Sequence, residues 1–153
     1  MEDVWKYPRP PALEPVPQSV RIVFAGRTVA ETGAAFRVLE TSHPPVYYLP
    51  RAAFTGCALE PASGRSFCEW KGEAHYWSIR AGDRLAERAA WSYPEPAPAY
   101  ASIQDHLAVY AGAMEGCFVG DEAVTPQPGG FYGGWVTRDL KGPFKGVPGS
   151  MGW

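Results

Sequence analysis

The hydrophobic and polar positions of this chain alternate in short runs, which is the pattern of β-strands rather than of amphipathic helices. Four such runs occupy residues 20–24, 27–31, 36–40 and 46–49. Ala25 and Gly26 between the first two runs predict a hairpin, and prolines bound the fourth run on both sides. We therefore expect the first third of the chain to form short antiparallel strands.

The clearest local prediction is a longer hairpin in the middle of the chain. Its strands cover residues 73–80 and 85–93, and Gly82-Asp83 between them suits a type II′ turn, in which glycine comes first. In this register the cross-strand pairs are 81 with 84, 79 with 86 and 77 with 88. Each face of the hairpin mixes polar and apolar side chains, although a hairpin buried on one side normally places its polar side chains on the other.

The remaining segments predict short elements and two irregular ends. We expect one helical turn at 51–54, a loop at 55–64, a short helix at 99–105, and strands at 106–110 and 118–119. Five prolines make residues 1–18 an extended, polyproline-like arm. Residues 125–153 combine glycines with five aromatic rings, which a flexible linker would not need. We expect this C-terminal extension to pack its rings on the body of the protein.

These elements predict a single, mainly β domain with a curled antiparallel sheet, barrel-like or tent-like, and one or two short helices. The arm at 1–18 and the extension at 125–153 flank a β body at 19–124. A length of 153 residues suits one domain, and 46% hydrophobic with 14% aromatic residues supply a core. Glycine and proline, 17 and 16 residues, disfavour a helical bundle, because each costs roughly 1–3 kcal/mol inside a helix.

Charge and cysteine content narrow the class of protein further. A net charge of −2 with scattered Lys and Arg predicts no nucleic-acid partner. No run approaches 18 apolar residues, so we expect no membrane partner. The N-terminus lacks the basic and apolar regions of a signal peptide, and Cys57, Cys68 and Cys117 are an odd, widely spaced set. We therefore expect a cytoplasmic protein with reduced thiols.

Three segments carry a family resemblance: RVLETSHPPVYYLP at 37–50, CEWKGEAHYW at 68–77 and AAWSYP at 89–94. In order and spacing these blocks resemble the bacterial domain-of-unknown-function 427 family (DUF427), which is also filed under a nucleotidyltransferase-like name. The resemblance covers about residues 20–124 and rests most on Trp-Lys-Gly-Glu-Ala followed by Tyr-Trp. It implies a small, mainly β domain with no settled activity.

The nucleotidyltransferase-like name predicts a chemistry that the motifs of this chain do not support. Nucleotidyl transfer normally uses two or three carboxylates, spaced as Asp-x-Asp or Asp-x-Glu, to hold Mg²⁺ on the nucleotide phosphates. The five aspartates form no such pair, and no phosphate-binding glycine loop is present. The three cysteines also lack the Cys-x-x-Cys spacing of a zinc site. We therefore predict no metal site and assign no cofactor, and keep a nucleotidyltransferase-like enzyme as the weakest alternative.

The polar residues inside the family-like blocks are the candidates for a site. They lie among aromatic side chains, and small-molecule sites are usually aromatic-walled clefts with a few convergent charged groups. The candidate catalytic residues are Glu40, His43, Lys71 and Glu73, and the candidate ligand-binding residues are Arg37, Tyr48, Lys71, Tyr76 and Trp91. Lys71 could present an ammonium to an anionic ligand, Glu40 or Glu73 could act as a general base, and His43 could act as acid, base or ligand.

Each candidate also has a structural interpretation. Lys71, Glu40 and Glu73 could form ion pairs in the core, His43 could bond local backbone, and Cys68 could be an inert buried thiol rather than a nucleophile. The leading hypothesis is a protein that binds a small polar or anionic molecule in an aromatic-lined pocket with Lys and Glu at its base. The alternative is a non-catalytic protein-interaction or homo-oligomerising module, present as a monomer or a homodimer. The sequence leaves open whether the protein is an enzyme.

Overall fold

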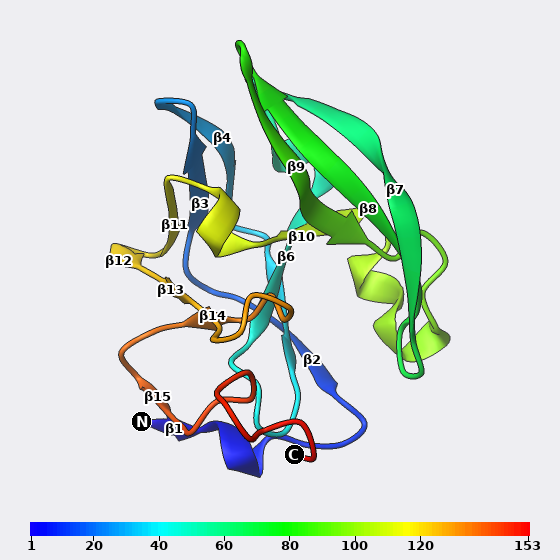
Figure 1. Cartoon of the computed structure of the whole chain (residues 1–153), viewed down its shortest axis with the longest axis vertical. Coiled ribbons are helices and arrows are strands. Elements are labelled where there is room, and N and C mark those ends of the chain that lie inside the picture. The colour runs from blue at the N-terminus through cyan, green and yellow to red at the C-terminus, as the bar shows by residue number, and fades with distance from the viewer.

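The computed structural model describes residues 1–153, and most of its regular secondary structure consists of β-strands (Figure 1). The main sheet is antiparallel, with seven strands in the order β2-β5-β6-β10-β9-β8-β7. These strands are β2 (Ala12–Pro15), β5 (Phe36–Leu39), β6 (Val46–Pro50), β7 (Ala58–Cys68), β8 (Gly72–Ala81), β9 (Arg84–Ser92) and β10 (His106–Val109). A second, four-stranded antiparallel sheet in the order β12-β11-β3-β4 consists of β3 (Val20–Phe24), β4 (Arg27–Thr32), β11 (Gly116–Val119) and β12 (Glu122–Ala123).

The smaller elements join the two ends of the chain to these sheets. Two further pairs of strands are β1 (Glu2–Asp3) with β15 (Leu140–Lys141) and β13 (Thr125–Pro126) with β14 (Trp135–Val136). The helical segments are short 3₁₀ helices, η1 (Val4–Lys6), η2 (Arg51–Ala53), η3 (Pro98–Ile103) and η4 (Ala111–Ala113), and η3 is kinked at Tyr100. None of them has the length and apolar character to cross a membrane. The predicted single, mainly β domain is confirmed, and its antiparallel sheets stay open rather than closing into a barrel.

Both faces of the seven-stranded sheet are buried, and β6 shows how this arises. Tyr47 and Leu49 point to one side of the sheet, and Tyr48 between them points to the other. On the first side the sheet packs against the four-stranded sheet, whose Ile22 and Val29 are fully buried. Burying one such side chain stabilises the fold by about 1.5–3 kcal/mol. This face therefore holds the larger part of the core.

The second face of the main sheet is covered by η3 and the segment around it. Tyr100 and Ile103 of η3 are buried there against Trp91 of β9. The central hairpin therefore contributes to two cores at once, because Ala74 faces η3 whereas Ile79 faces the four-stranded sheet. Burial on both sides explains why its faces mix polar and apolar residues in the sequence.

The central hairpin forms as predicted near its turn and departs from the prediction farther away. The pairs nearest the turn are those expected, and Gly82 has the positive φ, 62°, that the first position of the turn needs. Trp77, however, pairs with Ala90 instead of Arg88, so this part of the predicted register is wrong. The cause is a β-bulge at Arg88, which adopts a φ of 48° and donates its backbone N–H to Ser78 Oγ (3.1 Å).

The prediction of a loop at 55–64 is wrong, because β7 begins at Ala58 and forms the edge of the main sheet beside β8. The segment has no clear alternation and contains Pro61 and Gly64, which are typical of loops. Its strand conformation comes from backbone pairing with β8, interrupted by an irregularity between Pro61 and Arg65. An edge strand tolerates proline and bulges because only one of its sides needs partners.

The C-terminal extension packs on the body through one buried ring. Trp135 is only 1% exposed, stacks on Tyr47 with ring centroids 5.1 Å apart, and donates its Nε1–H to the Val109 carbonyl (3.0 Å). Phe131, by contrast, is 76% exposed. The two termini lie at the same end of the molecule in Figure 1, where the rings of Trp5 and Trp153 are in contact. The extension is thus a structural part of the domain.

Candidate functional site

The second face of the main sheet carries most of the candidate residues, in a group of rings that we call the aromatic cluster. Its members are Tyr48, Tyr76, Trp91, Tyr93, Tyr100 and Tyr110. They come together because β6, β8, β9 and η3 each direct an aromatic side chain to this face. The Trp91 and Tyr110 rings lie 4.6 Å apart, and the Tyr100 hydroxyl donates to the Pro11 carbonyl (2.7 Å), which fixes the N-terminal arm over the cluster.

Lys71 reaches the aromatic cluster from the turn between β7 and β8. Its backbone carbonyl accepts a hydrogen bond from Ala97 N (3.0 Å), and its side chain is folded inward, so that the residue is only 7% exposed. The ammonium lies 5.7 Å from the centroid of the Tyr93 ring. No carboxylate lies within 4.0 Å of it, since none of the ion pairs in the structure includes Lys71.

The surroundings of Lys71 supply neutral hydrogen-bonding groups rather than negative charge. Burial raises the pKa of the Tyr48 and Tyr93 phenols, so both stay protonated. A cation over a tyrosine ring gains about 0.5–2 kcal/mol. The Nζ atom still reaches solvent, because Ser42 Oγ is the one fully buried side-chain polar atom without a partner. The ammonium therefore favours a negative partner that the chain itself does not place beside it.

His43 lies in the turn between β5 and β6, beneath the C-terminal extension. Its Nδ1 accepts a hydrogen bond from Gln127 Nε2 (3.0 Å), and its ring meets the edge of Tyr132 with centroids 4.9 Å apart. The pKa of His43 is lowered, first by burial and then by the Lys145 and Lys71 ammonium groups, although the Glu40 carboxylate acts in the opposite direction. The imidazole is therefore neutral at neutral pH, with the proton on Nε2.

The neutral state of His43 should make the extension sensitive to acid. The pKa of His43 in the folded protein lies below the ordinary 6.5, so protonation of this residue favours the unfolded chain. The stability that neutral His43 contributes is therefore complete above pH 6.5 and is lost as the pH falls below it. Protonated Nδ1 would also face the Gln127 amide donor. We expect the melting temperature to fall more between pH 7.5 and 5.5 for the wild type than for His43→Phe, which keeps the ring contact with Tyr132 and does not titrate. An equal fall in both proteins would contradict this.

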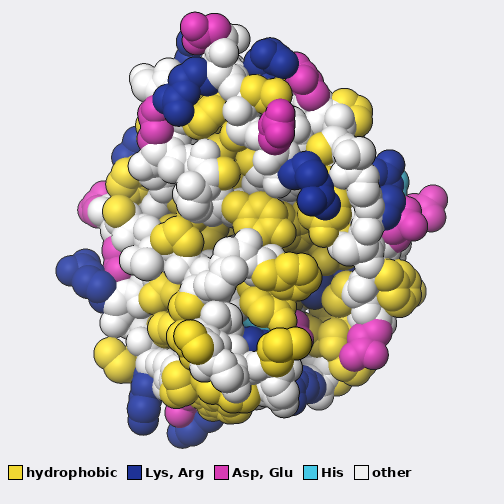
Figure 2. Space-filling model, viewed as in Figure 1, with side chains coloured by type: hydrophobic (Ala, Val, Ile, Leu, Met, Phe, Trp, Pro, Cys, Tyr) yellow, Lys and Arg dark blue, Asp and Glu magenta, His cyan; other side chains and the backbone are white.

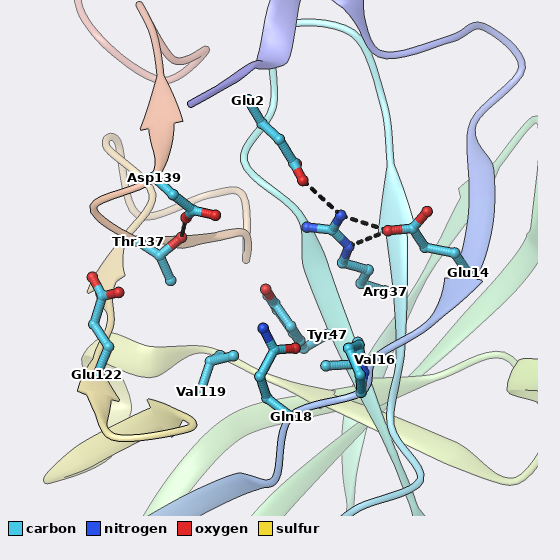
Figure 3. Close-up of a pocket in the computed structure, with 11 residues that line it drawn as sticks. Glu2, Glu14, Val16, Gln18, Arg37, Tyr47, Val119, Glu122, Thr137 and Asp139 are labelled. Carbon is cyan, nitrogen blue, oxygen red and sulfur yellow. Dashed lines mark hydrogen bonds and ion pairs between the residues drawn. The ribbon is translucent and has the colours of Figure 1, made fainter.

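Two candidate residues lie away from Lys71. The Glu73 side chain is 60% exposed and contacts His75 Nε2 (2.9 Å) and Arg65 Nε (4.0 Å) on the outer surface of the hairpin. Arg37 points to the opposite face of the main sheet, into a cavity where it binds Glu14 and Glu2 (Figure 3). The structure thus brings together Glu40, His43, Lys71, Tyr48, Tyr76 and Trp91, and places Glu73 and Arg37 elsewhere.

The aromatic cluster is closed in this structure. None of the five main cavities is lined by Lys71, Glu40 or Tyr48. The C-terminal extension covers part of the cluster, and Gly133 lies so close to Trp91 that an added Cβ would come within 2.0 Å of its ring. Figure 2 shows, in the lower half of the view, hydrophobic side chains around a hollow in which atoms of positively charged residues and of histidine are visible. The predicted site residues therefore form a packed group rather than the walls of an open pocket.

Several residues of this region were not among the candidate site residues named from the sequence. Tyr93 and Tyr100 flank the proline-rich connector at 94–98, which reverses the chain and returns both rings to one cluster. The prolines were a usable signal for these two residues. Gln127 and Tyr132 reach His43 from the extension, and no local pattern marks them. No three His, Cys, Asp or Glu side chains converge closely enough to share a metal ion.

A comparison with known protein families gives a match. Residues 12–120 match a family model named NTP_transf_9 and described as a domain of unknown function (DUF427). No curated protein matches the chain. The matched residues run from β2 to β11 and include Lys71 and the whole aromatic cluster, whereas Gln127 and Tyr132 lie beyond the match.

Proposed function

The chain belongs to the DUF427 family, and we propose that within this fold it binds a small anionic molecule at the Lys71 ammonium. The observation that carries the proposal is a lysine that is only 7% exposed and has no carboxylate within 4.0 Å. The Tyr93 ring lies beside the ammonium and packs against Tyr48, and both phenols are protonated and can donate hydrogen bonds to an anion. Aromatic rings around one ammonium group fit a small ligand better than a macromolecule.

The contacts of the neighbouring carboxylates favour this proposal over a structural ion pair. A pair in the core would place Glu40 or Glu73 against Lys71. Glu73 instead contacts His75 and Arg65 at the surface. Glu40 makes no ion pair, and its charge acts on His43 and the cluster tyrosines. In our proposal Glu40 limits the negative charge that the site accepts.

Access to Lys71 is proposed to require movement of the extension. Gly133 lies over Trp91, and Tyr132 lies over His43. Neither residue is anchored by a buried side chain of its own. Gln127 holds the segment, because it accepts a hydrogen bond from the Gly134 N–H and donates one to His43 Nδ1. This part of the chain can open locally at a lower free energy than the strands beneath it. Ligand binding should therefore be slower than diffusion allows.

Replacing Lys71 by methionine should abolish anion binding without weakening the fold. Methionine has a similar length and no charge, so the free energy of unfolding should stay the same or rise. Thermal-shift titration with sodium phosphate, sulfate or acetate, against sodium chloride at equal ionic strength, should raise the melting temperature of the wild type but not of Lys71→Met. Lys6→Met, which removes an exposed charge, should respond as the wild type does. If Lys71 were half of a buried ion pair, Lys71→Met would instead cost about 3–5 kcal/mol.

A further inference from the structure

A separate cavity of about 310 Å³ lies on the opposite face of the main sheet (Figure 3). Tyr47 lines it, whereas the adjacent Tyr48 points into the aromatic cluster. Figure 3 shows two facing walls, with Glu2, Arg37 and Glu14 on one and Thr137, Asp139 and Glu122 on the other. Residues from both ends of the chain, outside the family match, thus complete this cavity.

The cavity carries an excess of negative charge. Four carboxylates and one guanidinium, that of Arg37, line it. Arg37 forms ion pairs with the carboxylates of only one wall. Arg37 donates from Nη2 to Glu2 (3.0 Å) and from Nε to Glu14 (2.6 Å). Burial and the Asp139 carboxylate each act to raise the pKa of Glu2. Hydrogen bonds from Arg37 and Tyr7 outweigh them, so the pKa of Glu2 is lowered overall. Like charges therefore face one another across the cavity.

The wall that carries Asp139 has no buried counter-charge. Asp139 accepts a hydrogen bond from the Thr137 hydroxyl, which is neutral. Glu122 contacts Arg138 Nε (3.4 Å), but the Arg138 side chain is almost entirely exposed, so solvent screens this pair. A cation placed in the cavity would relieve the repulsion between its walls.

The Tyr47 hydroxyl points independently to a ligand. Tyr47 is 5% exposed, its ring stacks on Trp135, and its hydroxyl is directed into the cavity (Figure 3). Burial raises its pKa, although the nearby Arg37 lowers it in part. No N–H of Arg37 meets it with hydrogen-bonding geometry, and no other side chain does. The hydroxyl is open to the cavity, where its oxygen can accept a hydrogen bond from a bound donor.

We propose that this cavity binds a short aliphatic amine in its ammonium form, with the nitrogen between Asp139 and the Tyr47 hydroxyl. An ammonium offers three N–H donors and no acceptor, which suits carboxylate and phenol oxygens. Val16 and Val119 line the cavity and can cover the methylene groups. The carboxylates do not converge as metal ligands do, so the site fits an ammonium ion better than a metal ion. The proposal does not depend on anion binding at Lys71.

Calorimetric titration of the full chain with 1,4-diaminobutane tests the proposal. We expect saturable binding that weakens in high salt, and no binding of 1,4-butanediol, which has the same length without the charges. Absence of binding heat with the diamine, or equal binding of the diol, would overturn it. Displacement of the diamine by MgCl₂ beyond the effect of NaCl at equal ionic strength would show a metal site and would also overturn it.

Two variants locate the bound amine. Asp139→Asn keeps an acceptor for Thr137 and should weaken binding roughly tenfold or more, because a hydrogen bond to a charged group is lost. Tyr47→Phe keeps the stack on Trp135 and should weaken binding roughly fivefold, since a neutral hydrogen bond is lost. Glu87→Gln removes one exposed charge far from the cavity and should bind as the wild type does. Unchanged affinity in Tyr47→Phe would overturn the assignment even if Asp139→Asn failed to fold.

Discussion

Replacing Trp135 by alanine should lower the free energy of unfolding by about 3–5 kcal/mol, the cost of truncating a fully buried aromatic side chain. Trp135 is 1% exposed, stacks on Tyr47 and donates a hydrogen bond to the Val109 carbonyl, which would lose its partner. Because a domain of this size is stable by only about 5–15 kcal/mol, the loss is a large fraction of the total. Urea denaturation followed by far-UV circular dichroism measures it.

Phe131→Ala is the matched control for Trp135→Ala. It removes an aromatic ring from the same extension, but this ring is exposed, so the stability should change by less than about 0.5 kcal/mol. Similar losses of stability in the two variants would mean that the extension does not stabilise the protein mainly through the buried ring of Trp135. Truncation after Val124 removes both rings and should destabilise the protein at least as much as Trp135→Ala.

Replacing Gly133 by alanine should release the extension from the aromatic cluster and destabilise the protein by about 1–3 kcal/mol, the usual cost of overpacking. The new Cβ would lie 2.0 Å from Trp91 Cη2 and 2.8 Å from Cζ3. Trp91 is itself packed against Tyr110, so its ring has little room to move. Gly133 does not have a positive φ, so the effect is steric alone. Urea denaturation and hydrogen exchange of residues 127–134 would both report it.

Gly152→Ala provides the comparison for Gly133→Ala, because Gly152 also lies in the extension, has no positive φ and has no atom within 4 Å of an added Cβ. Its stability should stay within about 0.5 kcal/mol of the wild type. If Gly133→Ala were equally harmless, the close contact with Trp91 would not hold the extension. If our proposed function is right, Gly133→Ala should also speed anion binding at Lys71.

Local sequence patterns were sufficient for much of the fold. Ala25-Gly26 marked the hairpin of β3 and β4, where both residues adopt the positive φ values of 55° and 72°. Two features escaped prediction because they depend on partners distant in the sequence. β7 is a strand because β8 lies beside it, and Arg88 is bulged because the backbone pairing of β8 and β9 shifts there.

The candidate site was predicted in part for a related reason. Tyr48, Lys71 and Trp91 lie in the family-like blocks, and the structure gathers them on one face. Alternation along β8 separates Glu73 from this group, because its neighbour Ala74 is the residue that points to the aromatic cluster. That separation could have been inferred from the strand pattern. The cavity between Tyr47 and Asp139 could not, because its walls join segments from opposite ends of the chain.

The parallel pairing of β1 with β15 sets the order in which this protein can be completed during synthesis. Glu2 pairs with Leu140, so β1 must wait for a partner strand that is synthesised much later. Closing so long a loop is slow compared with forming the local hairpins β3–β4 and β8–β9. We therefore expect a nascent chain whose hairpins form early while Tyr47 stays uncovered until Trp135 emerges, an interval in which chaperones would find exposed aromatic surface.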